Sequence, residues 1–107
     1  MDITILIERD GVRSYTSVSS QATGIEGVNR IRWAGEARSK NYVPYYSLVH
    51  VFTGRSLNRV PLSEKDALSL IEALKECPVE FEKIVDSSTA RRYYVQCLTP
   101  EAARLAG

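Results

Sequence analysis

The stretch YVPYYSLVHVFTG, residues 42–54, is the densest apolar segment of this 107-residue chain. Side chains of a strand alternate between its two faces, and counted from Tyr45 both faces of this segment are apolar. The first face carries Tyr45, Ser47, Val49 and Val51, and the second carries Tyr46, Leu48, His50 and Phe52. Such a strand must be covered on both sides, either by the rest of the chain or by another molecule.

Length and composition indicate one globular domain spanning residues 1–107. Chains of roughly 100–200 residues usually form a single domain. The hydrophobic content of 44% and the charged content of 25% are ordinary for such a domain. The formal net charge of +1 gives no whole-protein field that would attract nucleic acid or a membrane surface.

The N-terminal sequence and the cysteines indicate a soluble, cytoplasmic protein. Residues 1–10, MDITILIERD, carry acidic groups where a signal peptide needs basic ones, and no apolar run is long enough to span a membrane. Cys77 and Cys97 are therefore expected to be reduced thiols.

The first part of the chain predicts a β-hairpin. Residues 3–9 alternate apolar and polar side chains, and residues 12–20 do so again. Between them stand Asp10 and Gly11, a pair that suits a two-residue hairpin turn because both turn positions need positive φ. We therefore expect the two strands to pair antiparallel.

Two further strands are expected before the middle of the chain. Residues 28–35 alternate more weakly. The strand of the opening stretch starts after Pro44, which cannot donate to a ladder, and extends from Tyr45 to Thr53.

One amphipathic helix is predicted between Ser63 and Pro78. Ser63 is a natural N-cap with Asp66 three residues later, and Pro78 ends the helix. Its apolar residues fall within an arc of about 120°, namely Ala67, Leu70, Ile71, Leu74 and Cys77. A single apolar stripe means one buried face, so the helix should lie on one face of a sheet.

The remaining residues predict a second hairpin and a short helical end. Residues 79–85 and 90–98 alternate like strands, and Thr99 with Pro100 begins a C-terminal helical turn that should fray. The order β-β-β-β-α-β-β defines an α+β fold with a mostly antiparallel sheet of about five to six strands and one helix packed on one face. One helix covers such a sheet only in part, so the second apolar face should partly curl on itself as a partial barrel and partly meet another molecule.

No arrangement of residues indicates catalysis, a cofactor or a metal. His50 is the only histidine, and it lies mid-strand between Leu48 and Phe52, where a structural role is usual. Cys77 lies at the wrong helix end for an activated thiolate, and the spacing of one His and two Cys is not that of a zinc module. We therefore expect a protein that is not an enzyme.

Charge is divided unevenly along the chain. Residues 28–62 hold six basic residues against one acidic residue, a net charge of +5. Residues 63–86 hold three basic residues against seven acidic ones, a net charge of −4. The acidic helix face, Glu64 and Glu72 included, would resemble a row of phosphates, although a solvated helix face is the simpler interpretation.

Aromatic and arginine residues coincide in the basic segment and again near residues 91–94. Tyr, Trp and Arg are enriched at the centres of protein–protein interfaces. We expect a partner-binding surface composed of Trp33, Arg38, Tyr42, Tyr45, Tyr46, Arg55, Arg59, Arg91 and Tyr93.

These residues admit three interpretations: a protein interface, a nucleic-acid interface, or tyrosines half-buried in a sheet whose arginines are solvated. We favour another protein as the partner, since the chain lacks the basic excess and the motifs of nucleic-acid modules. The expected class is a small non-enzymatic binding protein of the inhibitor, immunity or regulatory type, common among phages and mobile elements. A homodimer through an uncovered strand edge is also expected to be feasible. The alternative is a nucleic-acid-binding module that uses the same surface.

Overall fold

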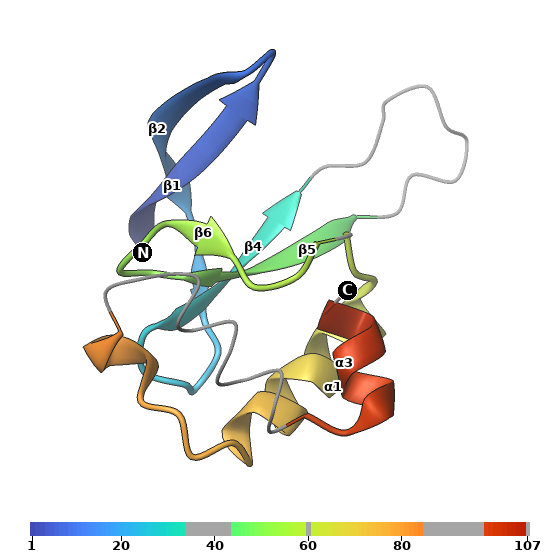
Figure 1. Cartoon of the computed structure of the whole chain (residues 1–107). Helices are drawn as coiled ribbons and strands as arrows, with labels where there is room; N and C mark the ends of the chain where they lie inside the picture. The colour runs from blue at the N-terminus through green and yellow to red at the C-terminus, as the bar shows by residue number, and fades with distance from the viewer. Residues whose placement is uncertain (34–43, 60, 85–97, 107) are drawn as a thin grey trace.

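A four-stranded antiparallel sheet lies between a β-hairpin on one face and two helices on the other (Figure 1). The computed structural model describes residues 1–33, 44–59, 61–84 and 98–106. Its strands are β1 (Asp2–Arg9), β2 (Val12–Ser19), β3 (Gln21–Ala22), β4 (Val28–Trp33), β5 (Tyr45–His50) and β6 (Arg55–Ser56). Its helical elements are α1 (Glu64–Lys75), the 3-10 turn η1 (Phe81–Lys83) and α3 (Pro100–Ala106). The α+β class expected from the sequence is confirmed.

The predicted N-terminal hairpin is confirmed. β1 pairs antiparallel with β2 over the whole length of both strands, from Arg9 opposite Val12 to Asp2 opposite Ser19. Asp10 has φ 52° and Gly11 has φ 78°, the left-handed conformations that a tight two-residue turn requires. The turn fixes the register, so each β1 residue has a defined partner on β2.

A corner at Ser20 turns the chain out of the hairpin and into the central sheet, whose strand order is β3-β4-β5-β6. The Ser20 backbone N–H donates to the Met1 carbonyl at 2.7 Å, and the Ser20 hydroxyl donates to the same carbonyl at 2.8 Å. Asn29 on β4 donates to the Ser20 hydroxyl oxygen at 2.9 Å. These hydrogen bonds join the first residue, the corner and β4.

The helices cover one face of the central sheet. Ser63 caps α1, because its hydroxyl oxygen accepts from the Asp66 backbone N–H at 3.2 Å, as predicted. The apolar stripe of α1 meets Tyr46 and Leu48 of β5 in the larger core cluster. That cluster consists of Val28, Tyr46, Leu48, Leu57, Leu62, Ala67, Leu70, Ile71, Leu74, Phe81 and Ala106.

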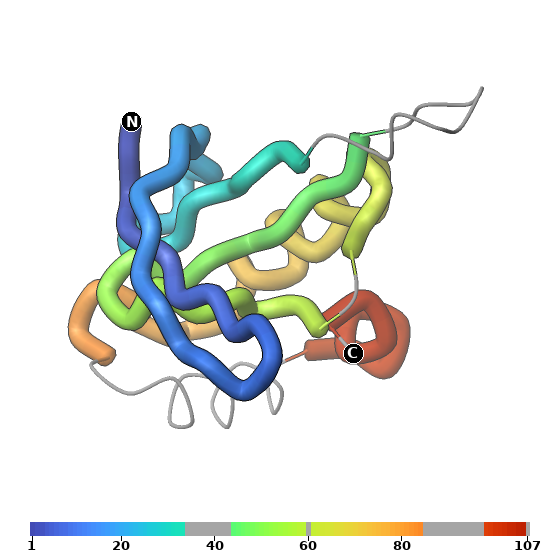
Figure 2. Tube along the Cα trace, turned by 90° about the horizontal axis from the view of Figure 1, so that it is seen from above, coloured from blue at the N-terminus to red at the C-terminus, as the bar shows by residue number. Residues whose placement is uncertain are grey.

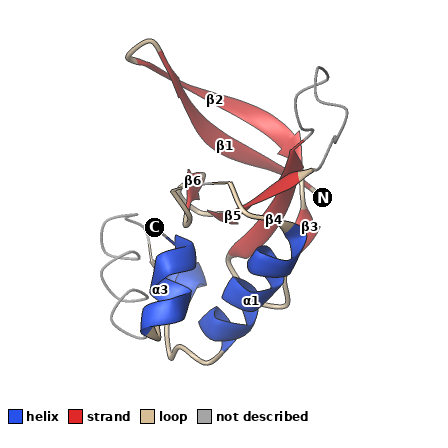
Figure 3. Ribbon diagram, turned by 90° about the vertical axis from the view of Figure 1, so that its right-hand side faces the viewer, coloured by secondary structure: helices blue, strands red, loops and turns tan. Residues whose placement is uncertain are grey.

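The hairpin covers the opposite face of the sheet. Ile3 and Ile5 of β1 pack against Ile31 of β4 and Val49 of β5 in a second buried cluster. Figure 2, looking down from the hairpin side, shows the hairpin crossing over β5, and Figure 3 shows hairpin, sheet and helices in succession. The chain itself therefore covers both apolar faces of β5 in part, the helices the face with Leu48 and the hairpin the face with Val49.

The turn after β5 brings the far edge of β1 against the central sheet. The Leu6 backbone N–H donates to the Gly54 carbonyl at 2.9 Å. Gly54 has φ 72°, and a Cβ at this position would lie 2.8 Å from the Thr4 carbonyl oxygen. Only glycine allows β1 to approach the turn this closely. The hairpin and the sheet thus partly enclose the second cluster.

Several sequence predictions about the fold are wrong. The described strands form two sheets, of two and four strands, because the chain bends at Ser20. Residues 79–85 were expected to be a strand, but residues 81–83 form the turn η1, because Phe81 is drawn into the larger core and is 0% exposed. The expected strand at 90–98 lies, except for its last residue, outside the described residues. The predicted C-terminal helical turn is confirmed as the seven-residue helix α3, but the expected fraying is wrong, because α3 packs on α1 with Ala102 and Ala106 buried.

Asn58 extends the short ladder beyond β6. Its Oδ1 accepts from the Leu48 backbone N–H at 2.8 Å, where β6 has already ended. We expect Asn58→Ala to lower the free energy of unfolding by about 1–3 kcal/mol, because the buried Leu48 N–H loses this acceptor. Urea denaturation measures the change, with Ser14→Ala as the control, since Ser14 is exposed on β2 and should shift the value by less than about 0.5 kcal/mol. Equal effects of the two substitutions would contradict the assigned role of Asn58.

Candidate protein-binding surface

Trp33 and Tyr45 form an aromatic pair at the end of the central sheet. They are the last partners in the β4–β5 register, and their rings stack with centroids 6.3 Å apart and planes at 21°. The Trp33 indole N–H donates to the Ser47 hydroxyl oxygen at 3.0 Å, which fixes the ring. Both residues are half-buried. The pair therefore presents a rigid, partly exposed aromatic surface.

Tyr46 does not share this surface. Its side chain lies on the opposite face of β5, is 5% exposed and belongs to the larger core cluster. The Arg30 guanidinium lies over its ring at 4.9 Å and also donates to Gln21 at 2.6 Å. The strand alternation places adjacent tyrosines on opposite faces. Tyr46 is therefore a core residue, and the interpretation of it as a contact residue is corrected.

The remaining described residues of the expected surface are dispersed. Arg55 is exposed on β6 opposite His50. It lies at the other end of β5 from Tyr45, roughly 17 Å along the strand at about 3.3 Å per residue. Arg59 is exposed, and its backbone N–H donates to the Ala106 carbonyl at 3.0 Å. The structure thus joins Trp33 with Tyr45 and leaves these two arginines elsewhere.

Four expected contact residues, Arg38, Tyr42, Arg91 and Tyr93, lie outside the described residues. Arg32 directly precedes Trp33 on β4 and is exposed, but its partner in the register is Tyr46, so its side chain lies on the opposite face of the sheet from the aromatic pair.

His50 is built into the interior. It is 0% exposed, and its Nε2 lies 2.7 Å from the Phe81 carbonyl oxygen, which can only accept, so Nε2 carries a proton. Nδ1 lies 2.9 Å from the Thr53 hydroxyl oxygen. With both nitrogens engaged, the ring joins β5 to η1. Throughout the described part of the chain, no buried side-chain nitrogen or oxygen lacks a hydrogen-bond partner.

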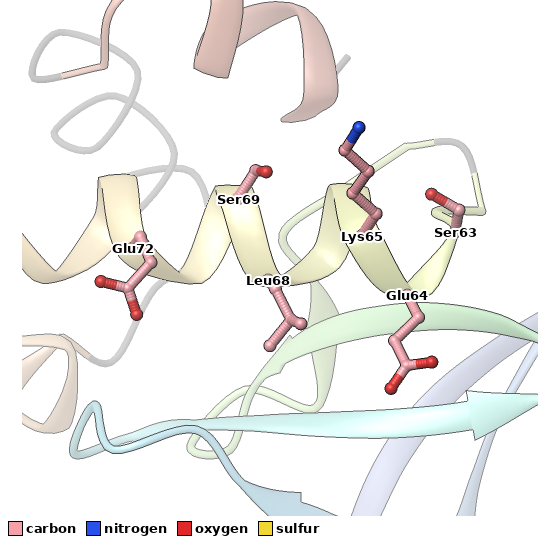
Figure 4. A pocket seen from close by; sticks show the side chains of 6 residues that line it. All are labelled: Ser63, Glu64, Lys65, Leu68, Ser69 and Glu72. Atoms are coloured by element: carbon pink, nitrogen blue, oxygen red, sulfur yellow. The ribbon is translucent and has the colours of Figure 1, made fainter.

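The acidic helix face carries an open hollow of about 650 Å³. Figure 4 shows Glu64, Leu68 and Glu72 projecting from one side of α1, while Lys65 and Ser69 project from the other side. Leu68 is 49% exposed. Glu72 also pairs with Lys75 at 3.4 Å, so part of its charge is compensated. The hollow is a solvated groove along the helix.

A second hollow, of about 340 Å³, lies around Pro78 and Ile84. Its two charged residues pair with each other, since Lys83 Nζ lies 2.9 Å from Glu80 Oε2. The hydrogen bond to Glu80 raises the pKa of Lys83 above its ordinary value. Among residues 1–33, 44–59, 61–84 and 98–106, no three His, Cys, Asp or Glu side chains cluster as metal ligands would.

The outer part of the hairpin is a surface that sequence reasoning missed. Val12 and Tyr15 on β2 are each 68% exposed. The alternation of residues 12–20 indicated a strand, but it did not show that the hairpin extends past the sheet that it covers. Figure 3 shows this projection of β1 and β2.

Comparison with protein-family models, with curated proteins and with solved structures finds no match for this chain. No helix in the described part has the length and hydropathy needed to cross a membrane. The fold and the surface define an α+β protein with a hairpin, a sheet and a helical layer and with an aromatic pair at one sheet end.

Proposed function

We propose that this chain is a small non-enzymatic protein that binds another protein through the sheet end at Trp33 and Tyr45. The stacked, half-buried pair is the observation that supports the proposal. Tryptophan and tyrosine contribute a large share of the binding energy at protein interfaces. The inhibitor, immunity or regulatory type remains the class that we propose.

Preorganisation makes this pair a suitable contact. The hydrogen bond from Trp33 to Ser47 and the packing of Trp33 on the second cluster hold the indole in place before a partner arrives. A side chain that is already ordered loses little conformational entropy on binding.

The same geometry supports a nucleic-acid interface less well. Single-strand binders stack bases on free aromatic faces and hold phosphates with nearby basic groups. Here the two rings stack on each other, and Arg30 and Arg32 lie on the opposite face of β4 from Trp33, where Arg30 contacts Tyr46 and Gln21. We therefore retain the nucleic-acid-binding module as the alternative, and the experiment must distinguish it from a protein-binding module.

The test is affinity capture from the native host with the tagged chain, followed by measurement of the captured partner's affinity. We expect Trp33→Ala and Tyr45→Ala each to weaken binding by about tenfold or more. The matched control is Phe52→Ala, an aromatic side chain that is 64% exposed elsewhere on the surface and should leave the affinity unchanged. Thermal melting of each variant shows whether the fold is retained.

Salt dependence separates the two partner classes. Binding to phosphates should weaken steeply as salt rises, in proportion to the number of contacts. A protein interface centred on apolar rings should respond weakly. Folded Trp33→Ala and Tyr45→Ala variants that bind as well as the wild type would remove the basis of the proposal. A steep salt dependence together with nuclease sensitivity would establish the alternative.

A further inference from the structure

The outer edge of β2 is a long strand edge with little of the usual protection. Among the described residues, β2 pairs only with β1. Its eight residues, VRSYTSVS, include no proline and one charged residue, Arg13, which pairs with Glu8 of β1 at 3.8 Å, and six of the eight are exposed. Natural proteins usually block such edges with charges, prolines or bulges, because exposed strand edges pair with other strands.

The hydrogen-bond pattern of the hairpin identifies the groups that this edge presents. In a two-residue hairpin, the residues next to the turn, Arg9 and Val12, form a hydrogen-bonded pair, and the pattern then alternates. Leu6 confirms the alternation, because its N–H points away from β2 and donates to Gly54. Its partner Tyr15 must then also point its N–H and C=O away from β1. The outward backbone groups of β2 are therefore those of Arg13, Tyr15, Ser17 and Ser19.

We propose that this edge pairs with the same edge of a second copy of the chain, antiparallel across a two-fold axis at Tyr15. The proposal uses a surface separate from Trp33 and Tyr45 and does not depend on the proposed function. It joins the two hairpins into one four-stranded sheet in the order β1-β2-β2-β1.

The β2 sequence is self-complementary in this register. With Tyr15 opposite Tyr15, the exposed Val12 comes opposite Val18 of the second copy, and Arg13 comes opposite Ser17. Leu6 is the β1 partner of Tyr15, so an apolar row of Leu6, Tyr15, Tyr15 and Leu6 would cross the joined sheet. Apolar and aromatic cross-strand pairs of this kind stabilise sheets.

Other registers pair the strand less well. A shift that centres the axis on Thr16 places Ser14 opposite Val18 and Val12 opposite Ser20, so apolar residues meet polar ones. A shift that centres it on Arg13 places two guanidinium groups directly opposite each other, which is destabilising. The Tyr15-centred register also covers both of the most exposed apolar side chains of β2, Val12 and Tyr15.

Sedimentation equilibrium over a concentration series tests the proposal. A single strand edge is a small interface, so we expect a dissociation constant on the order of 10–100 µM. Tyr15→Lys places two ammonium groups across the axis and should weaken the dimer by about tenfold or more. Tyr15→Phe keeps the apolar row and is the matched control, which should dimerise like the wild type.

Ser17→Pro is a second, independent variant. It removes one outward N–H from the edge but no hydrogen bond from the β1–β2 ladder, so the hairpin should remain folded while the dimer weakens. Circular dichroism confirms the fold of each variant. If Ser17→Pro fails to fold, the Tyr15→Lys variant still tests whether the dimer forms through the edge of β2.

Cysteine cross-linking tests the register. Tyr15→Cys places two thiols on a hydrogen-bonded pair with Cα atoms about 5.5 Å apart, within disulfide reach. Ser19→Cys is the control, because its two copies would lie roughly 26 Å apart along the strands. Oxidation should give a covalent dimer of the first variant only, above the background of the parent chain with its own two cysteines.

Three results would overturn the proposal. The chain stays monomeric at concentrations about ten times above the expected dissociation constant. Alternatively, a dimer forms but folded Tyr15→Lys retains wild-type affinity, so the contact lies elsewhere. Finally, Ser19→Cys cross-links as readily as Tyr15→Cys, so the register is wrong.

Discussion

Phe81→Ala should lower the free energy of unfolding by about 3–5 kcal/mol, the range for truncating a buried aromatic side chain. Phe81 is 0% exposed and belongs to the larger core cluster together with α1 residues. Its removal leaves a cavity between η1, β5 and the helix, because the surrounding side chains relax only in part. Urea denaturation followed by circular dichroism gives the value.

The chain supplies a matched control for this prediction. Its only other phenylalanine is Phe52, which is 64% exposed, so Phe52→Ala should change the free energy of unfolding by less than about 0.5 kcal/mol. If Phe81→Ala leaves too little folded protein, Phe81→Leu should still show a loss of about 1 kcal/mol, since most of the volume is kept. Similar losses at Phe81 and Phe52 would mean that Phe81 is not in the core.

Gly54→Ala should be the second most destabilising change, because two effects add. The residue has φ 72°, a conformation that costs an alanine about 1–2 kcal/mol. The new Cβ would also lie 2.8 Å from the Thr4 carbonyl oxygen and 3.1 Å from the Ile5 Cα, so β1 must shift. Backbone atoms cannot move aside like a side chain, and overpacking of this kind costs roughly 1–3 kcal/mol more.

Gly11→Ala separates the two effects. Gly11 has φ 78°, close to that of Gly54, but a Cβ there would meet nothing within 4 Å. Its substitution should therefore cost only the conformational part, about 1–2 kcal/mol. The difference between the two variants measures how closely β1 approaches the turn after β5. No difference in thermal or urea stability would show that β1 does not press on this turn.

The elements that the sequence predicted correctly are those with local signals. Three of them depend only on residues that are close together in the sequence: the Asp10-Gly11 turn, the Ser63 cap and the apolar stripe of α1. Residues 79–85 satisfied the strand pattern equally locally. The turn η1 forms there because distant groups hold Phe81: His50 donates to its carbonyl oxygen, and the larger core cluster buries its ring.

The bend that divides the strands into two sheets could not be predicted from the sequence either. The bend depends on the hydrogen bonds that Ser20 forms with Met1 and with Asn29, and no local sequence pattern predicts these contacts. The candidate surface shows the same limit. Alternation placed Tyr45 and Tyr46 on opposite faces, but only tertiary packing decides which face receives the helix and which carries the stacked rings.

The two buried clusters lie on opposite faces of one sheet, and β5 contributes to both: Leu48 to the helical side and Val49 to the hairpin side. The hairpin is attached through the smaller cluster, the corner at Ser20 and the backbone hydrogen bond from Leu6 to Gly54. A subglobal opening that releases β1 and β2 would leave the helical cluster intact. Amide protons of the hairpin should then exchange with solvent through an opening of lower free energy than the opening that exposes the amides of β5. The molecule would therefore unfold as two cooperative units that both contact β5.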